Sequence, residues 1–99
     1  MRRKPEIRWS EESVRRTDNI LSYLFEHWTE KEATNFLKSL EAFEEIVCYF
    51  PEIYPESQLK KGFRRAVISK QISVIYSVRQ HVIEVHTLFD NRQNPDTLI

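Results

Sequence analysis

Three histidines of this 99-residue chain could act as general bases or hold a metal ion. His81 and His86 could accept a proton in a reaction. However, His81 falls in a predicted turn, and a strand histidine such as His86 can equally be a satisfied surface or core residue. Together with His27, they lack cysteine or histidine partners at the spacing of a metal site. We therefore expect no metal centre and no catalytic histidine.

Cys48 and Gly62, the only cysteine and the only glycine, bear on three further chemistries. A single cysteine cannot form an internal disulfide, which fits a reducing compartment. No histidine or basic residue lies near Cys48 in the sequence to activate its thiol, so we interpret it as a helix residue rather than a nucleophile. One glycine cannot build a glycine-rich phosphate loop. We expect no cofactor.

Basic side chains in the second half of the chain are the remaining candidates, as a surface that binds a target. Arg64 and Arg65 are adjacent, so on a strand they point to opposite faces and only one can join an exposed patch. The other would cover the acidic helices with its apolar stem. The target-binding candidates are Lys60, Lys61, Arg64, Arg65, Arg79 and Arg92.

Charge is distributed unevenly along the chain, although the net charge is zero. Residues 1–10 carry +3, residues 11–56 carry −7 and residues 57–99 carry +4. This pattern indicates either opposite potentials on opposite sides of the domain or a solvated surface without functional meaning. The neutral total argues against autonomous DNA binding, which usually requires a strongly basic domain.

The length suits a single domain with one core, spanning residues 1–99. No apolar run approaches the roughly eighteen residues of a membrane span. The basic start, Met1-Arg2-Arg3-Lys4-Pro5, lacks the apolar stretch of a secretory signal. These features predict a cytoplasmic protein without membrane contact.

A helical hairpin is predicted between residues 10 and 50, after a short strand at residues 6–9. Ser10 has the position of an N-cap, and Thr29 begins a capping box that ends at Glu32. Pro51 disfavours helical geometry at Phe50, so the second helix should stop there. Apolar residues at helical spacing form a stripe on each helix: Val14, Leu21, Leu24, Phe25 and Trp28, then Ala33, Phe36, Leu37, Leu40, Phe43, Val47 and Phe50.

Strand-like alternation replaces the helical period from Gly62 onward. Runs at residues 63–68, 72–78 and 82–89 are joined by short turns, which predicts an antiparallel meander. The helical hairpin must cover its apolar face. The sequence therefore predicts an α+β fold of order β-α-α-β-β-β, with the hairpin packed on a small antiparallel sheet.

Three segments in order resemble the RelE/ParE toxin superfamily of type II toxin–antitoxin systems, over residues 6–95. The first is Ile7-Arg8-Trp9-Ser10 with the helix that follows. The second is Gly62-Phe63-Arg64-Arg65 with the 72–78 run and its Tyr76. The third is Leu88-Phe89-Asp90-Asn91-Arg92-Gln93-Asn94-Pro95, which is similar to a segment of the ParE, or plasmid stabilisation, type.

The resemblance implies one of two activities, RNA cleavage of the RelE type or poisoning of DNA gyrase of the ParE type. RelE-type members place a phosphate-contacting arginine where this chain has Ser73, and a late tyrosine where it has Leu98. Neither residue supplies the charge or the proton that cleavage needs. We therefore expect a gyrase inhibitor that causes growth arrest and is not an enzyme, with Arg92 as the best single target contact. The alternatives are a ribosome-dependent mRNA endonuclease and a degenerate, non-toxic binding module.

The resemblance also implies a cognate antitoxin as partner. A partly disordered antitoxin segment would fold onto the helical hairpin and the sheet edge. Ile20 and Tyr23, beside the apolar stripe of the first helix, are the antitoxin-binding candidates, with peripheral core as the other interpretation. DNA would be contacted only through the antitoxin, and gyrase, or the ribosome in the alternative, would be the target.

Overall fold

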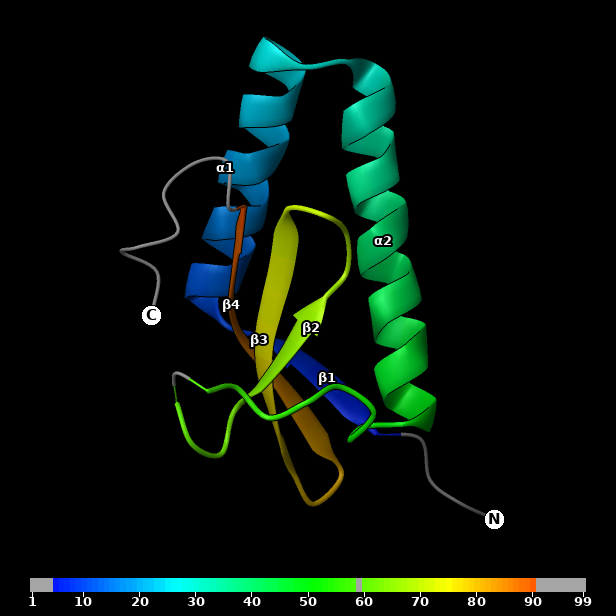
Figure 1. Ribbon diagram of the computed structural model, residues 1–99, viewed down its shortest axis with the longest axis vertical. Helices are drawn as coiled ribbons and strands as arrows, with labels where there is room; N and C mark the ends of the chain where they lie inside the picture. The colour runs from blue at the N-terminus through cyan, green and yellow to red at the C-terminus, as the bar shows by residue number, and fades with distance from the viewer. Residues whose placement is uncertain (1–4, 59, 91–99) are drawn as a thin grey trace.

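A computed structural model describes residues 5–58 and 60–90 of the chain. Its elements are β1 (Glu6–Trp9), α1 (Glu11–His27), α2 (Glu30–Tyr49), β2 (Arg64–Val67), β3 (Ile72–Arg79) and β4 (Val82–Asp90). Two long helices form a hairpin against one face of a sheet (Figure 1). The predicted α+β class and element order are confirmed.

The helix ends follow the capping signals of the sequence. The Ser10 hydroxyl accepts a hydrogen bond from the Ser13 amide at 3.0 Å, and the Thr29 hydroxyl accepts one from the Glu32 amide at 3.2 Å. Each bond satisfies a backbone donor that the helix cannot satisfy internally. α2 ends at Tyr49, directly before Phe50 and the predicted stop at Pro51.

The sheet is mixed rather than purely antiparallel. Its strand order is β1-β4-β3-β2, and β1 pairs in parallel with β4, with Ile7 opposite Ile83 and Trp9 opposite Val85. The expected meander of β2, β3 and β4 is antiparallel as predicted. The expectation of an antiparallel sheet failed at β1 because parallel pairing is set by the long crossover that follows this strand, which a pattern within four residues cannot reveal.

The buried face of α1 differs from its predicted stripe. Ser13, Ile20 and Leu24 are buried, whereas Val14, Phe25 and Trp28 expose between 47% and 58% of their surface. Ser13 is fully buried, and next to it the start of α1 is joined to β4, where the Ser10 hydroxyl donates to the His86 carbonyl at 2.8 Å.

The core lies between the hairpin and one face of the sheet. On α2 the predicted stripe is buried except for Leu37 and Phe50, which remain exposed. Phe43, Tyr54 and Tyr76 pack their rings together, with centroids 5.5 to 6.2 Å apart. Within residues 5–58 and 60–90, neither helix is long and apolar enough to cross a membrane.

A bulge in β4 shapes the opposite face of the sheet. Ile75 of β3 pairs with Thr87, but the next residue, Tyr76, pairs with Val85. His86 therefore has no partner in the ladder. Bulges of this kind re-aim the side chains around them, and here the bulge lies beside the candidate site.

Candidate functional site

Arg64 serves as an anchor for the loop that follows α2. Its guanidinium Nη1 donates to the Tyr54 carbonyl at 2.7 Å and to the Glu52 carbonyl at 3.3 Å. Its Nη2 lies 3.4 Å from the Glu52 carboxylate. These contacts engage both terminal nitrogens of the guanidinium, so Arg64 fixes residues 52–54.

Arg65 points to the opposite face of the sheet, as the sequence predicts for adjacent strand residues. Its Nε donates to the Ser73 hydroxyl at 3.1 Å, and its guanidinium lies 5.4 Å from the Phe89 ring centroid. A guanidinium therefore lies beside Ser73, the position at which RelE-type proteins are expected to have an arginine. Arg65 therefore supplies a positive charge at this place that Ser73 itself does not, although Arg65 is half-buried and bonded.

A hollow of about 420 Å³ lies on this face, beside the start of α1. Lys60 lies 4.5 Å from the Phe63 ring centroid, and that ring stacks on His86 with centroids 4.4 Å apart. The hollow thus combines an aromatic wall, one ammonium group and one carboxylate. Its lining residues are Ser10, Glu12, Ser57, Lys60, Phe63, Ile75, His86 and Thr87.

The surroundings of His86 in this hollow favour its neutral imidazole. Burial lowers its pKa, and Lys60 adds to that effect, while Glu84 opposes it. The imidazole Nε2 is 2.7 Å from the Ser77 hydroxyl. A neutral, half-buried imidazole can accept a proton. Sequence reasoning gave His86 little weight because nothing in the sequence signals the bulge that positions it.

Glu12 places negative charge at the rim of the same hollow. The Thr87 side chain is the largest influence that lowers the pKa of the Glu12 carboxyl; burial raises it, and the charge of Arg16 lowers it further. Glu12 is therefore ionised at neutral pH. A phosphate in the hollow would meet this carboxylate as well as Lys60.

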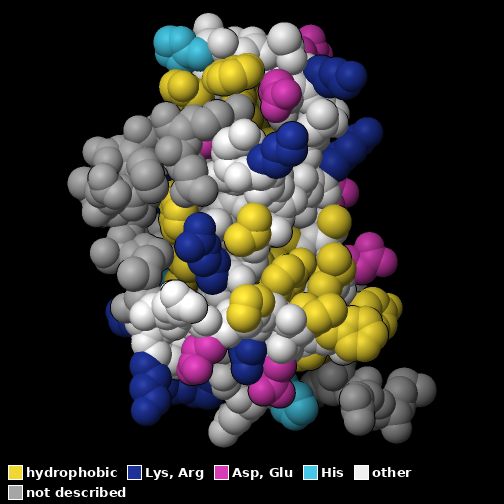
Figure 2. Space-filling view, in the orientation of Figure 1, with side chains coloured by type: hydrophobic (Ala, Val, Ile, Leu, Met, Phe, Trp, Pro, Cys, Tyr) yellow, Lys and Arg dark blue, Asp and Glu magenta, His cyan; other side chains and the backbone are white. Residues whose placement is uncertain are grey.

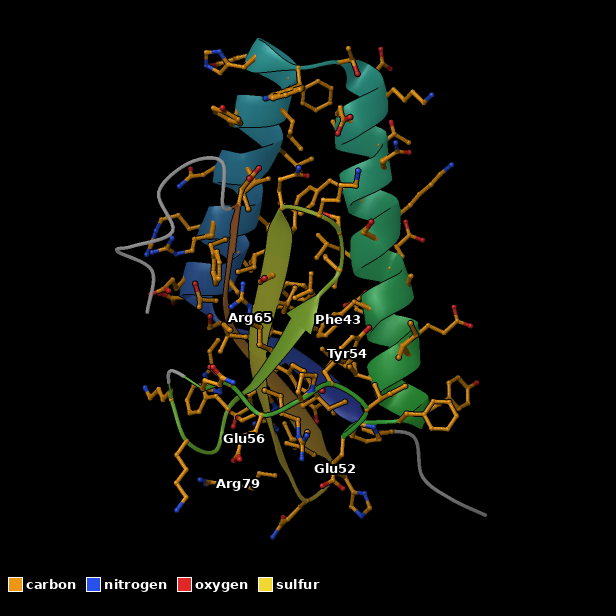
Figure 3. All side chains as sticks on the ribbon, in the orientation of Figure 1. Phe43, Glu52, Tyr54, Glu56, Arg65 and Arg79 are labelled. Carbon is orange, nitrogen blue, oxygen red and sulfur yellow. The ribbon has the colours of Figure 1, made fainter. Side chains whose placement is uncertain are left out.

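Of the other predicted target contacts, Lys61 and Arg79 do not line the hollow. Lys61 and Arg79 are exposed, Lys61 before β2 and Arg79 at the end of β3. Figure 3 shows Arg65 beside the sheet and Arg79 at its far end. Arg92 and Leu98 lie outside the described residues. Among the described residues, no group of three or more His, Cys, Asp or Glu could hold a metal ion.

A second hollow, of about 320 Å³, runs between α1 and α2 on the hairpin, and we name it the hairpin groove. Trp9, Val14, Leu37 and Leu40 supply its apolar lining. Its acidic residues are Asp18, Glu41 and Glu44, and Glu44 accepts a hydrogen bond from the Trp9 indole at 2.8 Å. The groove thus combines apolar side chains with three carboxylates.

The predicted antitoxin contacts fall elsewhere on α1. Ile20 exposes only 2% of its surface and belongs to the core, so the expectation that it is an exposed contact was wrong. Tyr23 is half-buried, and its ring lies 4.9 Å from that of His27. Sequence reasoning assigned Val14 and Leu37 to the core instead. A sign of their exposure is that each helix has more apolar residues than one buried face requires.

Comparisons with known proteins find similarity in structure and not in sequence. No family model matches the chain, and no curated protein matches it. A chain of the chromosomal ParDE TA system from P. aeruginosa superposes with a TM-score of 0.73 at 10% identity, over 88% of this chain and 96% of that chain.

Two further solved structures agree with this similarity. In the E. coli DinJ-YafQ toxin-antitoxin complex, a chain superposes with a TM-score of 0.66 at 12% identity, over 94% of this chain and 99% of that chain. The protein HP0894 from Helicobacter pylori gives a TM-score of 0.58 at 14% identity, over 89% and 96%. The chain therefore shares the α+β fold of these solved chains.

Proposed function

We propose that this chain is the toxin of a type II toxin–antitoxin pair, which binds DNA gyrase and is neutralised by a cognate antitoxin. The fold is shared with chains of the ParDE system and the DinJ-YafQ complex. Fold similarity alone does not carry function. The choice of binding over cleavage therefore depends on the candidate site itself.

The observation that favours binding is the arrangement of the basic side chains. Cleavage of an RNA strand gathers charge on phosphate oxygens, which convergent cations must stabilise. Here Arg64 is bonded to backbone carbonyls, Arg65 to Ser73, and Lys60 shares its hollow with the ionised Glu12. The two arginines therefore bind the protein's own groups, and Lys60 shares its hollow with a carboxylate. This arrangement offers little stabilisation to the negative charge of a phosphate transition state.

The second candidate function is a ribosome-dependent mRNA endonuclease. It is favoured by His86, whose neutral imidazole lies in the hollow with Lys60 and could accept a proton from a ribose hydroxyl. The guanidinium of Arg65 beside Ser73 is a further cation on the same face of the sheet.

The hairpin groove is the proposed antitoxin site. An apolar channel that also carries carboxylates suits an amphipathic segment that carries aliphatic anchors and lysines or arginines. Val14 and Leu37 would contact the anchors, and Asp18 and Glu41 the basic residues. Ile20 belongs to the core and is no longer a candidate contact. Tyr23, a half-buried residue of α1, remains a candidate antitoxin contact outside the groove lining.

Expression of the chain with and without the neighbouring open reading frame tests the proposal. Growth arrest that the neighbouring frame relieves supports a toxin–antitoxin pair. Purified toxin should then slow supercoiling by gyrase or trap cleaved DNA, and Arg92→Ala should weaken this effect. Codon-linked cleavage in a translation extract without any gyrase effect would establish the endonuclease instead. Finding neither activity and no growth arrest would indicate a non-toxic binding module.

A further inference from the structure

We propose that the free edge of β1 is a self-association site, on which a second copy of this chain adds its own β1 in the antiparallel direction. This inference does not depend on the proposed toxin function. β1 is the outer strand in the order β1-β4-β3-β2, so within residues 5–58 and 60–90 no strand lies along its far side. An edge of this kind offers unpaired amides and carbonyls to another chain.

The main chain of Ile7 and Trp9 faces this open edge. The Ser10 amide donates to the Val85 carbonyl of β4 at 3.0 Å, and the Glu6 amide bonds on the same side of the strand. Along a parallel strand, alternate residues direct their amides and carbonyls to the same neighbour. Ile7 and Trp9 therefore direct theirs away from β4 and supply the donors and acceptors that a further strand needs.

The opposite edge of the sheet, at β2, is covered by the chain itself. The Arg65 amide donates to the Pro55 carbonyl at 3.0 Å, and Glu56 forms an isolated antiparallel bridge with Arg64. Proteins protect a sheet edge either by covering it, as here, or by the charges that they place on it. At β1 the charges on the strand therefore determine what can pair there.

Open space adjoins the β1 edge on the side of α2. A hollow of about 460 Å³ is lined there by Pro5, Ile7, Glu44, Glu45, Cys48 and Tyr49. Tyr49 exposes 66% of its surface, and Figure 2 shows apolar side chains gathered over this lower end of α2. A second strand at the edge would cover part of this apolar surface in addition to pairing its main chain.

Two side chains of opposite charge, Glu6 and Arg8, lie on the face of β1 that points away from the helices. Side chains alternate along a strand, and Ile7 and Trp9 are the ones that pack against the core. The Arg8 Nε lies 2.7 Å from the Glu6 carboxylate, and both side chains are exposed, at 61% and 60%. This contact uses Nε, so the terminal nitrogens of the guanidinium can donate to a second carboxylate.

These charges allow the strand to pair with itself in one register. Antiparallel registers that set the open amides of two copies opposite each other are centred on Glu6, on Ile7 or on Arg8. The first places Glu6 opposite Glu6 and the last places Arg8 opposite Arg8, and like charges directly opposite destabilise a strand pair. The register centred on Ile7 instead places each Glu6 opposite the Arg8 of the other copy.

The sequence on either side of β1 has the same symmetry of charge. Arg2, Arg3 and Lys4 precede the strand, and Glu11 and Glu12 follow it. In an antiparallel pair, the sequence before one strand and the sequence after the other run to the same end, and here they have opposite charge. An edge that is protected against association carries charges that repel another edge. The pattern at β1 is attractive to its own copy, which identifies the occupant.

The test is sedimentation velocity of the purified chain over a range of about 1–500 µM. A short strand pair buries a small interface, so we expect a weak dimer that is half formed at about 100 µM. Glu6→Arg and Arg8→Glu each set like charges opposite each other and should weaken the dimer at least about tenfold. The matched control is Lys38→Glu, a charge reversal at an exposed position of α2, which should dimerise as the wild type does.

Two rescue experiments identify the register. A mixture of the Glu6→Arg chain with the Arg8→Glu chain restores both pairs of opposite charge and should form a heterodimer. The double variant Glu6→Arg/Arg8→Glu restores them within one sequence and should form a homodimer of wild-type affinity. A wild-type chain that stays monomeric at about 500 µM overturns the proposal. Single variants that dimerise as well as the wild type, or a mixture that stays monomeric, overturn it equally.

Discussion

A single residue, Tyr76, connects the core to the loop after α2. Its ring is buried, its hydroxyl bonds to the Pro51 carbonyl, and burial raises its pKa to about 12. Replacement by phenylalanine keeps the ring and removes the bond. We expect Tyr76→Phe to lower the free energy of unfolding by about 1–2 kcal/mol, as measured by urea unfolding at neutral pH.

The raised pKa of Tyr76 also predicts a dependence of stability on alkaline pH. The folded state holds the phenolic proton more tightly than the unfolded state does, so stability falls as pH rises from about 10, the ordinary tyrosine value, toward 12. The Tyr76→Phe variant should lose this part of the fall. Equal slopes of unfolding free energy against pH for the two proteins above pH 10 would show that Tyr76 ionises as easily in the folded state.

His86 predicts the opposite dependence at acidic pH. Burial lowers its pKa from the ordinary value of 6.5, so the folded state binds its proton less well than the unfolded state. This contribution is fully present above pH 6.5 and decreases as pH falls below it. His86→Gln should flatten the loss of stability just below pH 6.5, as measured by urea unfolding at a series of pH values.

The hairpin groove supports a prediction at the scale of the helices. Leu37→Lys places a charge in the apolar channel between α1 and α2 and should lower antitoxin affinity at least about tenfold. The matched control is Ala42→Lys, an exposed α2 position outside the groove lining. Calorimetric titration of each variant with the purified antitoxin measures the difference. Comparable affinities for the two lysine variants would remove the groove as the binding site.

Element boundaries were predictable because their causes are local. Ser10 and Thr29 cap the helices through side chains three residues from their partners, and Pro51 ends α2 by its own ring. The exposed face of α1 was not predictable from hydrophobicity, because a fully buried residue of this helix is the polar Ser13. The predicted stripe follows the most apolar face of the helix and therefore includes Val14.

The roles of the candidate-site residues were harder to predict from the sequence than the fold was. Opposite faces for Arg64 and Arg65 followed from strand geometry, and the contacts agree. Their structural roles did not follow, since the partners Tyr54 and Ser73 become neighbours only through sheet pairing. The position of His86 depends on a bulge opposite Ile75 and Tyr76, which has no mark in the sequence.

The charge distribution of the whole molecule should make association with the proposed antitoxin dependent on salt. Residues 11–56, which contain the hairpin, carry −7 in a chain of zero net charge, so a basic partner is attracted to one region rather than to the molecule as a whole. Raising the salt concentration from about 0.05 to 0.5 M shortens the screening length to a few ångströms and should slow association about tenfold. Dissociation should change less, because the apolar contacts of the groove persist in salt.

The double variant Asp18→Asn/Glu41→Gln should flatten the dependence of the association rate on salt, as measured by stopped-flow fluorescence of Trp9 in the groove. An association rate that does not change with salt would mean that the carboxylates of the groove play no part in attracting the antitoxin.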